Sequence, residues 1–265
     1  MGKLTQIILV TWLVVAADNV IAFDHGAWDE LLRQHVITER GGVATSVDYS
    51  GLSGKRSRLK EYLNSLAEVD QAAFEAWSKP DQLAFLINAY NAWTVELILT
   101  RYPDLDSIKD LGGFFSSPWK KAFIPLFGEK RSLDDIEHGM IRKRGSYNDP
   151  RIHFAVNCAS IGCPALRSEA YSGERLDEQL QQQTELFLAD RMRNRYTGDR
   201  FEVSAIFKWY REDFQQGWLD IHSVADLLLR YKASLGLTEA EADRLRNSKP
   251  SIHFLDYDWR LNAAP

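Results

Sequence analysis

The sequence predicts an α+β protein: a mostly helical single domain built around a buried central helix, with a small, mainly antiparallel sheet. Three observations predict this class. Segments with helical periodicity outnumber the short extended segments along the 265 residues. The stretch 79–101 is apolar on nearly every side, which is typical of a buried helix. The extended segments are scattered, whereas a parallel βαβ array would alternate them with helices.

The first 22 residues have the pattern of a cleavable export signal. Lys3 supplies the positive charge, an apolar run from 7 to 17 follows, and Val20-Ile21-Ala22 offers compact residues to a peptidase. The apolar run is shorter than the roughly 20 residues of a membrane-spanning helix. We therefore expect a signal peptide at 1–22, one domain at 23–265, no stable membrane span after cleavage, and a periplasmic or secreted protein. An uncleaved N-terminal anchor is the alternative.

The composition limits the classes of partner that this chain is expected to bind. The formal net charge is −5, and no basic patch is rich enough for nucleic acid, so we exclude that class of partner. Hydrophobic residues make up 45% of the chain, which is enough to bury a sizeable core. We expect a small-molecule or peptide ligand of unknown identity, and no cofactor.

Elements of the first half follow from periodicity and end signals. The central helix begins after Ser78-Lys-Pro-Asp81, a capping-box pattern with proline in the first turn. Ser132-Leu-Asp-Asp135 likewise begins a helix that reaches about residue 144. The remaining elements expected here are a helix at 28–36, an extended segment at 44–49, a helix at 56–66, and a hairpin at 123–132 that turns at Phe127-Gly128.

The second half alternates polar and apolar residues in two places. Asp149-Pro150 breaks the chain before Ile152–Asn157, whose alternation predicts a strand. Aromatic and acidic residues interleave at 254–262, which favours an ordered tail docked on the domain. The other elements expected are a helix at 172–193, a strand at 201–203, helices at 206–214, 224–235 and 239–247, and a final strand at 252–257.

Buried polar residues mark the first candidate site positions. Asn88 and Asn91 lie one turn apart inside the apolar central helix, so their amides need partners, either neighbouring backbone or a substrate. Glu137 falls within the apolar stripe of the helix after 132, and a carboxylate there must be paired or have a shifted pKa. His138 lies at the border of that stripe. An ion pair to a nearby arginine such as Arg151, with a half-exposed histidine, is the plainer interpretation.

The segment 151–164 carries the only two cysteines, Cys158 and Cys163, and three interpretations of them compete. They form a structural disulfide in an oxidising compartment. Alternatively, Cys158 is a nucleophile activated by His153 or His138, with Asn157 or Glu137 orienting the base. In the third interpretation both cysteines and both histidines hold zinc, although their spacing matches no standard zinc pattern. The sequence leaves these alternatives open, and we assign no metal site.

Five motifs of this chain resemble the domain-of-unknown-function family numbered 547. They are Phe85–Ala92, Ile136–Arg142, Asp149–Ser160 with Gly162–Pro164, Phe207–Phe214 and Asp256–Trp259. Together they span roughly residues 45 to 262. The order of a buried helix, a histidine and a strand with a second histidine is similar to papain-like and transglutaminase-like cysteine enzymes, and this similarity implies a distant relation in fold. In those enzymes the nucleophilic cysteine begins the central helix, whereas this helix carries asparagines.

Two hypotheses for function follow. In the first, the protein is an exported cysteine-dependent hydrolase or acyl-transferase for amide or peptide-like substrates. Cys158 is its nucleophile, His153 or His138 its base and Glu137 the orienting carboxylate. Asn88 or Asn91 helps to hold the oxyanion, and Asn157 and Arg151 complete the substrate-binding set. In the second hypothesis, the protein is a non-catalytic periplasmic binding or accessory module with a Cys158–Cys163 disulfide.

Overall fold

The computed structural model describes residues 22–113, 116–198, 200–247 and 251–265, so the expected signal peptide lies, apart from Ala22, outside the described residues. The α-helices are α1 (Gly26–His35), α2 (Tyr49–Gly54), α3 (Arg56–Ala67), α4 (Gln71–Ala76), α5 (Lys79–Leu99), α6 (Leu176–Ala189), α7 (Ile206–Trp209), α8 (Val224–Arg230) and α9 (Glu239–Asn247). The strands are β1 (Val36–Glu39), β2 (Ala44–Val47), β3 (Ile124–Leu126), β4 (Glu129–Arg131), β5 (Arg195–Tyr196), β6 (Arg200–Val203) and β7 (Ser251–Phe254). Short 3-10 segments are η1 (Arg40–Gly42), η2 (Ile108–Leu111), η3 (Pro118–Lys120), η5 (Pro150–Phe154), η6 (Gly173–Arg175) and η7 (Asp213–Gln215), and η4 (Asp135–Ile141) is π-helical.

The α+β class is confirmed, with the strands divided among separate small sheets. β1 pairs with β2, and β3 pairs with β4, both antiparallel. The third sheet has the order β5-β6-β7, in which β6 pairs antiparallel with β5 and parallel with β7. The β3–β4 hairpin turns at Phe127-Gly128, as the sequence predicts, and both of these residues have positive φ.

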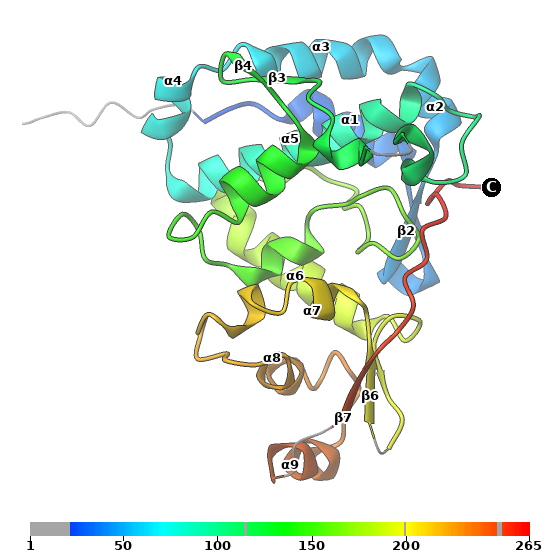
Figure 1. Ribbon diagram of the computed structural model, residues 1–265, viewed down its shortest axis with the longest axis vertical. Helices are drawn as coiled ribbons and strands as arrows, with labels where there is room; N and C mark the ends of the chain where they lie inside the picture. Colours follow the sequence, from blue (N-terminus) through cyan, green and yellow to red (C-terminus); the bar gives the residue numbers. More distant parts are fainter. Residues whose placement is uncertain (1–21, 114–115, 199, 248–250) are drawn as a thin grey trace, which may run out of the picture.

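The central helix α5 organises the larger of two apolar cores. Its residues are buried without interruption from Gln82 to Leu99, and its first turn is capped by Ser78, whose hydroxyl accepts the Asp81 amide. The helix lies between α3 and the later segments η4 and η6 (Figure 1). The second core gathers around Phe154 and the apolar faces of α7 and α8. These helices occupy the lower half of Figure 1.

The C-terminal segment runs back from β7 along the side of the molecule toward β2 (Figure 1). Leu261 forms an isolated bridge with Ser160, and Ala263 forms one with Val47. The docked tail expected from the aromatic and acidic pattern is therefore observed. It brings Tyr257 and Trp259 beside the two cysteines, which precede them by about 100 residues.

The predicted strand at 152–157 is wrong, because the chain forms the 3-10 segment η5 there. Pro150 occupies its first turn, and Asp149 accepts the Arg151 amide at 2.9 Å. Every residue from Pro150 to Asn157 is buried, so the alternation of residue types does not separate a buried face from an exposed one. No strand pairs with this segment among the described residues.

Four helices are clearly shorter than the sequence predicts, and one of them, expected at 224–235, ends at Arg230. The expected helix after 132 is a π-helical turn that ends at Ile141. The expected helices at 172–193 and 206–214 each divide into an α-helix and a separate 3-10 turn. By contrast, the helix at 239–247 has the predicted bounds. Where the chain packs tightly, tertiary contacts override the local helical periodicity.

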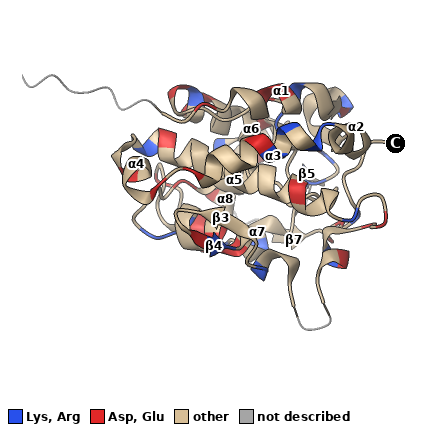
Figure 2. Ribbon diagram, turned by 90° about the horizontal axis from the view of Figure 1, so that it is seen from above, with Lys and Arg blue, Asp and Glu red and all other residues tan. Residues whose placement is uncertain are grey.

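The surface carries charges of both signs on its outer elements (Figure 2). Within the described ranges, the structure contains no helix with the length and apolar character that crossing a membrane requires.

Candidate functional site

A cavity of about 180 Å³ gathers several of the residues that the sequence singles out. Glu137, His138, Cys158 and Cys163 line it, although they come from two separate segments. We call this space the central cavity. Its other lining residues are Tyr90, Ser117, Trp119, Asp134, Val156, Pro164, Ile206, Trp209, Tyr210, Tyr257 and Trp259. Three larger cavities, of about 260, 440 and 520 Å³, are lined by none of the predicted site residues.

The π-helical turn η4 places Glu137 and His138 together on the cavity. The amide of Arg142 donates to the carbonyl of Glu137 at 2.8 Å, a bond that spans five residues. Such turns are rare and occur most often at functional sites. The structure thus brings two adjacent polar side chains onto one wall of the cavity.

Glu137 is held by two tyrosine hydroxyls. Glu137 is only 4% exposed, and the Tyr210 hydroxyl donates a hydrogen bond to Glu137 Oε1 at 2.7 Å. Tyr90 is a second hydrogen-bond partner of the carboxylate. Burial, followed by the charge of Glu137, raises the pKa of both tyrosines, so both hydroxyls stay protonated and act as donors. The buried carboxylate is therefore satisfied without a cationic side chain.

His138 lines the central cavity next to Asp134. Arg142 lies 2.6 Å from its Nδ1, and because a guanidinium can only donate, Nδ1 is the acceptor. The proton of the neutral ring then resides on Nε2, which lies 3.8 Å from Asp134 Oδ1. Burial raises the pKa of Asp134, and the charge of Glu137 adds to this increase, while His138 opposes it. Two carboxylates thus share one side of the cavity.

His153 does not line the central cavity. Its Nε2 lies 2.7 Å from Asp213 Oδ2, and its ring stacks on Tyr210 with the centroids 3.9 Å apart. Burial lowers the pKa of His153, which the hydrogen bond to Asp213 offsets only in part. Since a carboxylate can only accept, the proton of the neutral ring is on Nε2, and Nδ1 is buried without a partner.

Asp213 joins the two histidines through Arg142. Arg142 donates to Asp213 Oδ2 at 2.6 Å, and its guanidinium lies 4.7 Å from the ring centroid of Tyr210. Burial alone would raise the pKa of Asp213, but the hydrogen bonds from His153 and Arg142 outweigh it and hold that pKa well below its usual range. Sequence analysis assigned no role to Asp213 or Tyr210, although both lie within the motif Phe207–Phe214.

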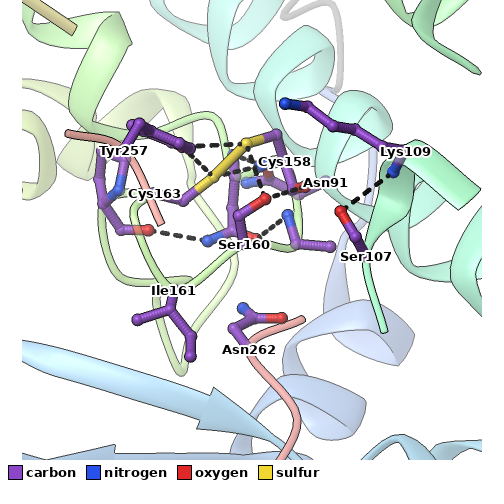
Figure 3. The surroundings of a disulfide bond; sticks show 12 residues. Asn91, Ser107, Lys109, Cys158, Ser160, Ile161, Cys163, Tyr257 and Asn262 are labelled. Carbon is purple, nitrogen blue, oxygen red and sulfur yellow. Dashed lines mark hydrogen bonds between the residues drawn. A yellow bond between two sulfur atoms is a disulfide. The ribbon is translucent and has the colours of Figure 1, made fainter. Parts of the chain in front are cut away.

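Cys158 and Cys163 form a disulfide in the wall of the central cavity (Figure 3), with their Cα atoms 6.2 Å apart. The Tyr257 hydroxyl donates to Cys163 Sγ at 3.1 Å and lies 3.2 Å from Cys158 Sγ, so its one proton is shared between the two sulfurs. The amide of Cys158 donates to Cys163 Sγ at 3.0 Å. The tail comes so close that a Cβ on Gly162 would meet the Tyr257 ring at 2.9 Å. Of the three interpretations, the disulfide is the one that the structure contains.

The three asparagines bind backbone. Asn88 donates to the Tyr171 carbonyl at 2.7 Å and accepts the amide of the same residue at 3.0 Å. Asn91 donates to the Ala155 carbonyl at 3.0 Å and accepts the Asn157 amide at 2.8 Å. The Asn157 side chain, in turn, bridges the Pro164 carbonyl and the Ala159 amide. These contacts correspond to the backbone alternative, and none of the three residues lines the central cavity.

Arg151 is also outside the central cavity. It pairs with Asp149 and Asp177, each at 2.7 Å, and its guanidinium lies 4.7 Å from the ring centroid of Trp218. Within the described residues, no group of three or more histidine, cysteine, aspartate or glutamate side chains could hold a metal ion. The four residues weighed as zinc ligands therefore do not form such a group.

Three aromatic residues from late in the chain also line the central cavity. Trp209, Tyr257 and Trp259 pack on one another with centroids 4.5 to 5.7 Å apart. Lys109 places its Nζ 3.6 Å from the centroid of Trp259, so this ring already accepts one cation. We call these three residues the aromatic wall. The interleaved pattern at 254–262 indicated an ordered tail, but not that the tail would line a cavity.

Residues 74–188 match the model of a family described as a protein of unknown function, DUF547. No curated protein and no solved structure matches the chain, so the likeness to papain-like and transglutaminase-like enzymes finds no support. The matched segment contains Glu137, His138 and both cysteines. It ends before Tyr210 and the aromatic wall, which means that one side of the central cavity comes from outside it.

Proposed function

We propose that this chain, which carries a DUF547 segment at 74–188, is a non-catalytic binding module that holds a small organic cation in the central cavity. The proposal includes export to the periplasm or outside the cell, and that part rests on the sequence pattern of residues 1–22 alone.

One observation carries the proposal: carboxylates and aromatic rings face the same small space. Asp134 and Glu137 line it together with the three residues of the aromatic wall. A cation over an aromatic ring gains about 0.5–2 kcal/mol, more as the site is desolvated, and recognition of quaternary ammonium groups uses this arrangement. Lys109 over Trp259 is an instance within the molecule itself.

The charges that face the cavity also favour a cation. Arg142, the arginine nearest to His138, is engaged by Asp213 and by the ring of Tyr210. Burial and the charge of Glu137 raise the pKa of Asp134 more than His138 and Lys120 lower it, so the ionised carboxylate would gain from further positive charge. A ligand cation would supply that charge, whereas an anion would meet two carboxylates.

The volume limits the ligand to a small group. A cavity of about 180 Å³ is below the roughly 300–1,000 Å³ of sites for drug-sized molecules. An alkylammonium or a guanidinium group fits this limit, either as a free small molecule or as the side chain of a peptide. Both sources offer the same chemistry to the carboxylates and rings.

Titration of the oxidised protein with simple probes tests the proposal. Tetramethylammonium and methylguanidinium are expected to perturb the fluorescence of the cavity tryptophans in a saturable way, whereas the neutral probe tert-butanol is not. Trp259→Leu is expected to weaken the binding of both cations, and Trp218→Leu, a tryptophan outside the cavity, serves as its matched control. Equal responses to the cations and to tert-butanol would contradict the proposal.

A cysteine-dependent hydrolase or acyl-transferase is the second candidate, because Cys158 and His138 line the same cavity. This function requires prior reduction of the disulfide. It also requires a base, while Nδ1 of His138 accepts from Arg142 and its Nε2 carries the proton. Amide and ester substrates offered to the reduced protein test this candidate, and activity that persists in Cys158→Ser would count against it.

A further inference from the structure

We propose that the Cys158–Cys163 disulfide is redox-active and exchanges with the dithiol of a peptide or protein that contacts the aromatic wall, with Cys158 as the sulfur attacked. This activity goes beyond ligand binding and requires no cation in the cavity.

The two sulfurs differ in access. Both cysteines line the central cavity, but Cys163 is only 2% exposed, whereas Cys158 is partly exposed. Thiol–disulfide exchange proceeds by attack of a thiolate on one sulfur, and the rate depends on which sulfur can be reached. The incoming thiolate therefore meets Cys158, and Cys163 is the leaving group.

The leaving sulfur has two hydrogen-bond donors in place. The Cys158 amide lies 3.0 Å from Cys163 Sγ, and the Tyr257 hydroxyl lies 3.1 Å from it. A disulfide sulfur has no proton, so Cys163 Sγ is the acceptor in both hydrogen bonds. Burial raises the pKa of Tyr257, which keeps its hydroxyl protonated. Hydrogen bonds to an ionised acceptor are about twice as strong as neutral ones, so these donors favour departure of the thiolate.

Contacts that do not involve sulfur hold the cysteine loop in shape. Ile161 donates its amide to the Arg260 carbonyl, and Gly162 donates to the Asp258 carbonyl, both at 2.8 Å. Asn157 fixes the start of the loop by bonds to Ala159 and Pro164. The thiols of the reduced protein therefore remain close together, which is a condition for reversible exchange.

The exchange balances in two steps. A thiolate of the dithiol, its proton released to solvent, attacks Cys158 Sγ; the new S–S bond forms as the Cys158–Cys163 bond breaks, and the electron pair goes to Cys163. The second thiol of the dithiol also loses its proton to solvent. Its thiolate then attacks the dithiol's own sulfur in the mixed disulfide and expels Cys158 as a thiolate. Both cysteines take up protons from solvent. The dithiol is oxidised to a disulfide, and the protein disulfide is reduced to two thiols.

The partner has a place to bind beside the reacting sulfur. Trp209 is 47% exposed, and Tyr257 contacts both this ring, at 4.8 Å between centroids, and the two sulfurs. The aromatic wall can therefore bind the apolar side chains that flank a peptide dithiol. The same tyrosine belongs to the wall and donates to the leaving sulfur.

The first test measures reduction of the folded wild-type protein by dithiothreitol and by glutathione, with acid quenching, alkylation and intact mass. We expect reduction of the folded protein at a rate no slower than that of the urea-unfolded protein. A disulfide that these thiols reduce only after unfolding overturns the proposal. This comparison needs no variant, so it holds even where a substitution prevents folding.

Variants then identify the sulfur attacked and the donor. With oxidised glutathione as the reagent, Cys163→Ala, with its fold checked by circular dichroism, is expected to form a mixed disulfide on Cys158 and to release one reduced glutathione, and Cys158→Ala is expected to form none on Cys163. Tyr257→Phe is expected to slow reduction about ten- to a hundredfold, the effect of one hydrogen bond to a charged group. Tyr196→Phe, which removes a hydroxyl bound to the Gly198 carbonyl, is expected to leave the rate unchanged. Mixed disulfides on both cysteines alike, or an unchanged rate in Tyr257→Phe, would argue against the assignment.

Failure of this proposal is separable from failure of the cation site. The cation titration uses oxidised protein without any thiol, and the exchange assay uses no cationic probe. Cation binding with an inert disulfide removes only the exchange activity, and exchange without cation binding removes only the binding function.

Discussion

Tyr210 donates its hydroxyl to Glu137 across 2.7 Å, while its ring contacts both His153 and the guanidinium of Arg142. His153 and Arg142 both bind the same carboxylate, Asp213. The position of Glu137 in the central cavity thus depends on residues that do not touch the cavity. This relationship leads to the first two predictions.

Tyr210→Phe is expected to lower the free energy of unfolding by about 1–2 kcal/mol, because a buried carboxylate loses one of its two phenol donors. Urea denaturation measures the change. Tyr196→Phe removes a hydroxyl from an exposed position and is the matched control, expected to change stability by less than about 0.5 kcal/mol. Equal effects of the two substitutions would mean that the contact with Glu137 contributes nothing to stability.

Asp213→Asn is expected to lower the free energy of unfolding by about 2–3 kcal/mol near neutral pH, since Arg142 loses its anionic partner. The wild-type protein should also be sensitive to acid. The pKa of Asp213 is depressed in the folded state, so its contribution is fully present above the ordinary aspartate pKa of about 3.9 and is lost as pH falls through the lower folded-state pKa. The stability difference between wild type and variant is therefore expected to shrink in acid. Unfolding curves recorded across this range measure it, and a constant difference would contradict the assignment.

Asn91→Ala is expected to destabilise the protein by about 2–4 kcal/mol, because the Ala155 carbonyl and the Asn157 amide both lose a buried partner. Asn64→Ala, at an exposed position in α3, is the matched control and should be nearly neutral. Thermal and urea unfolding of both variants would compare them. A small effect of Asn91→Ala would indicate that its amide does not hold the segment that leads into the cysteines.

Cation binding is expected to strengthen as pH rises from about 4 to about 7, because a raised pKa delays the ionisation of Asp134 and a cation binds the ionised form better. Titrations with tetramethylammonium at several pH values measure this trend. Asp134→Asn should weaken binding about tenfold at neutral pH and flatten the dependence. Glu68→Gln removes one charge from an exposed site outside the cavity and should change neither. Affinity that does not vary with pH in the wild type would exclude a role for Asp134.

Local sequence patterns were sufficient to predict the elements that depend on neighbouring residues or on apolar character along their whole length. The apolar run and the Ser78 cap predicted the buried central helix, and Phe127-Gly128 predicted the hairpin turn, because a cap and a turn are decided by neighbours in sequence. The same logic failed at 152–157. Alternating residue types there resembled a strand, yet a strand forms only with a partner, and no partner lies beside this segment among the described residues.

The candidate site divides along the same line. By itself, the sequence determined which side chains had to find partners: two buried asparagines, a glutamate in an apolar stripe and two cysteines five residues apart. Tertiary structure alone decided what those partners are. In the folded protein the asparagines form hydrogen bonds with backbone groups, and Glu137 accepts hydrogen bonds from two tyrosines. Tertiary structure also brought Asp213 and the aromatic wall, whose motifs gave no sign of their partners, into the surroundings of Glu137. The reason is physical. Sequence periodicity shows which polar groups are buried and therefore require a hydrogen-bond partner, whereas packing between segments far apart in the chain decides which group that partner is.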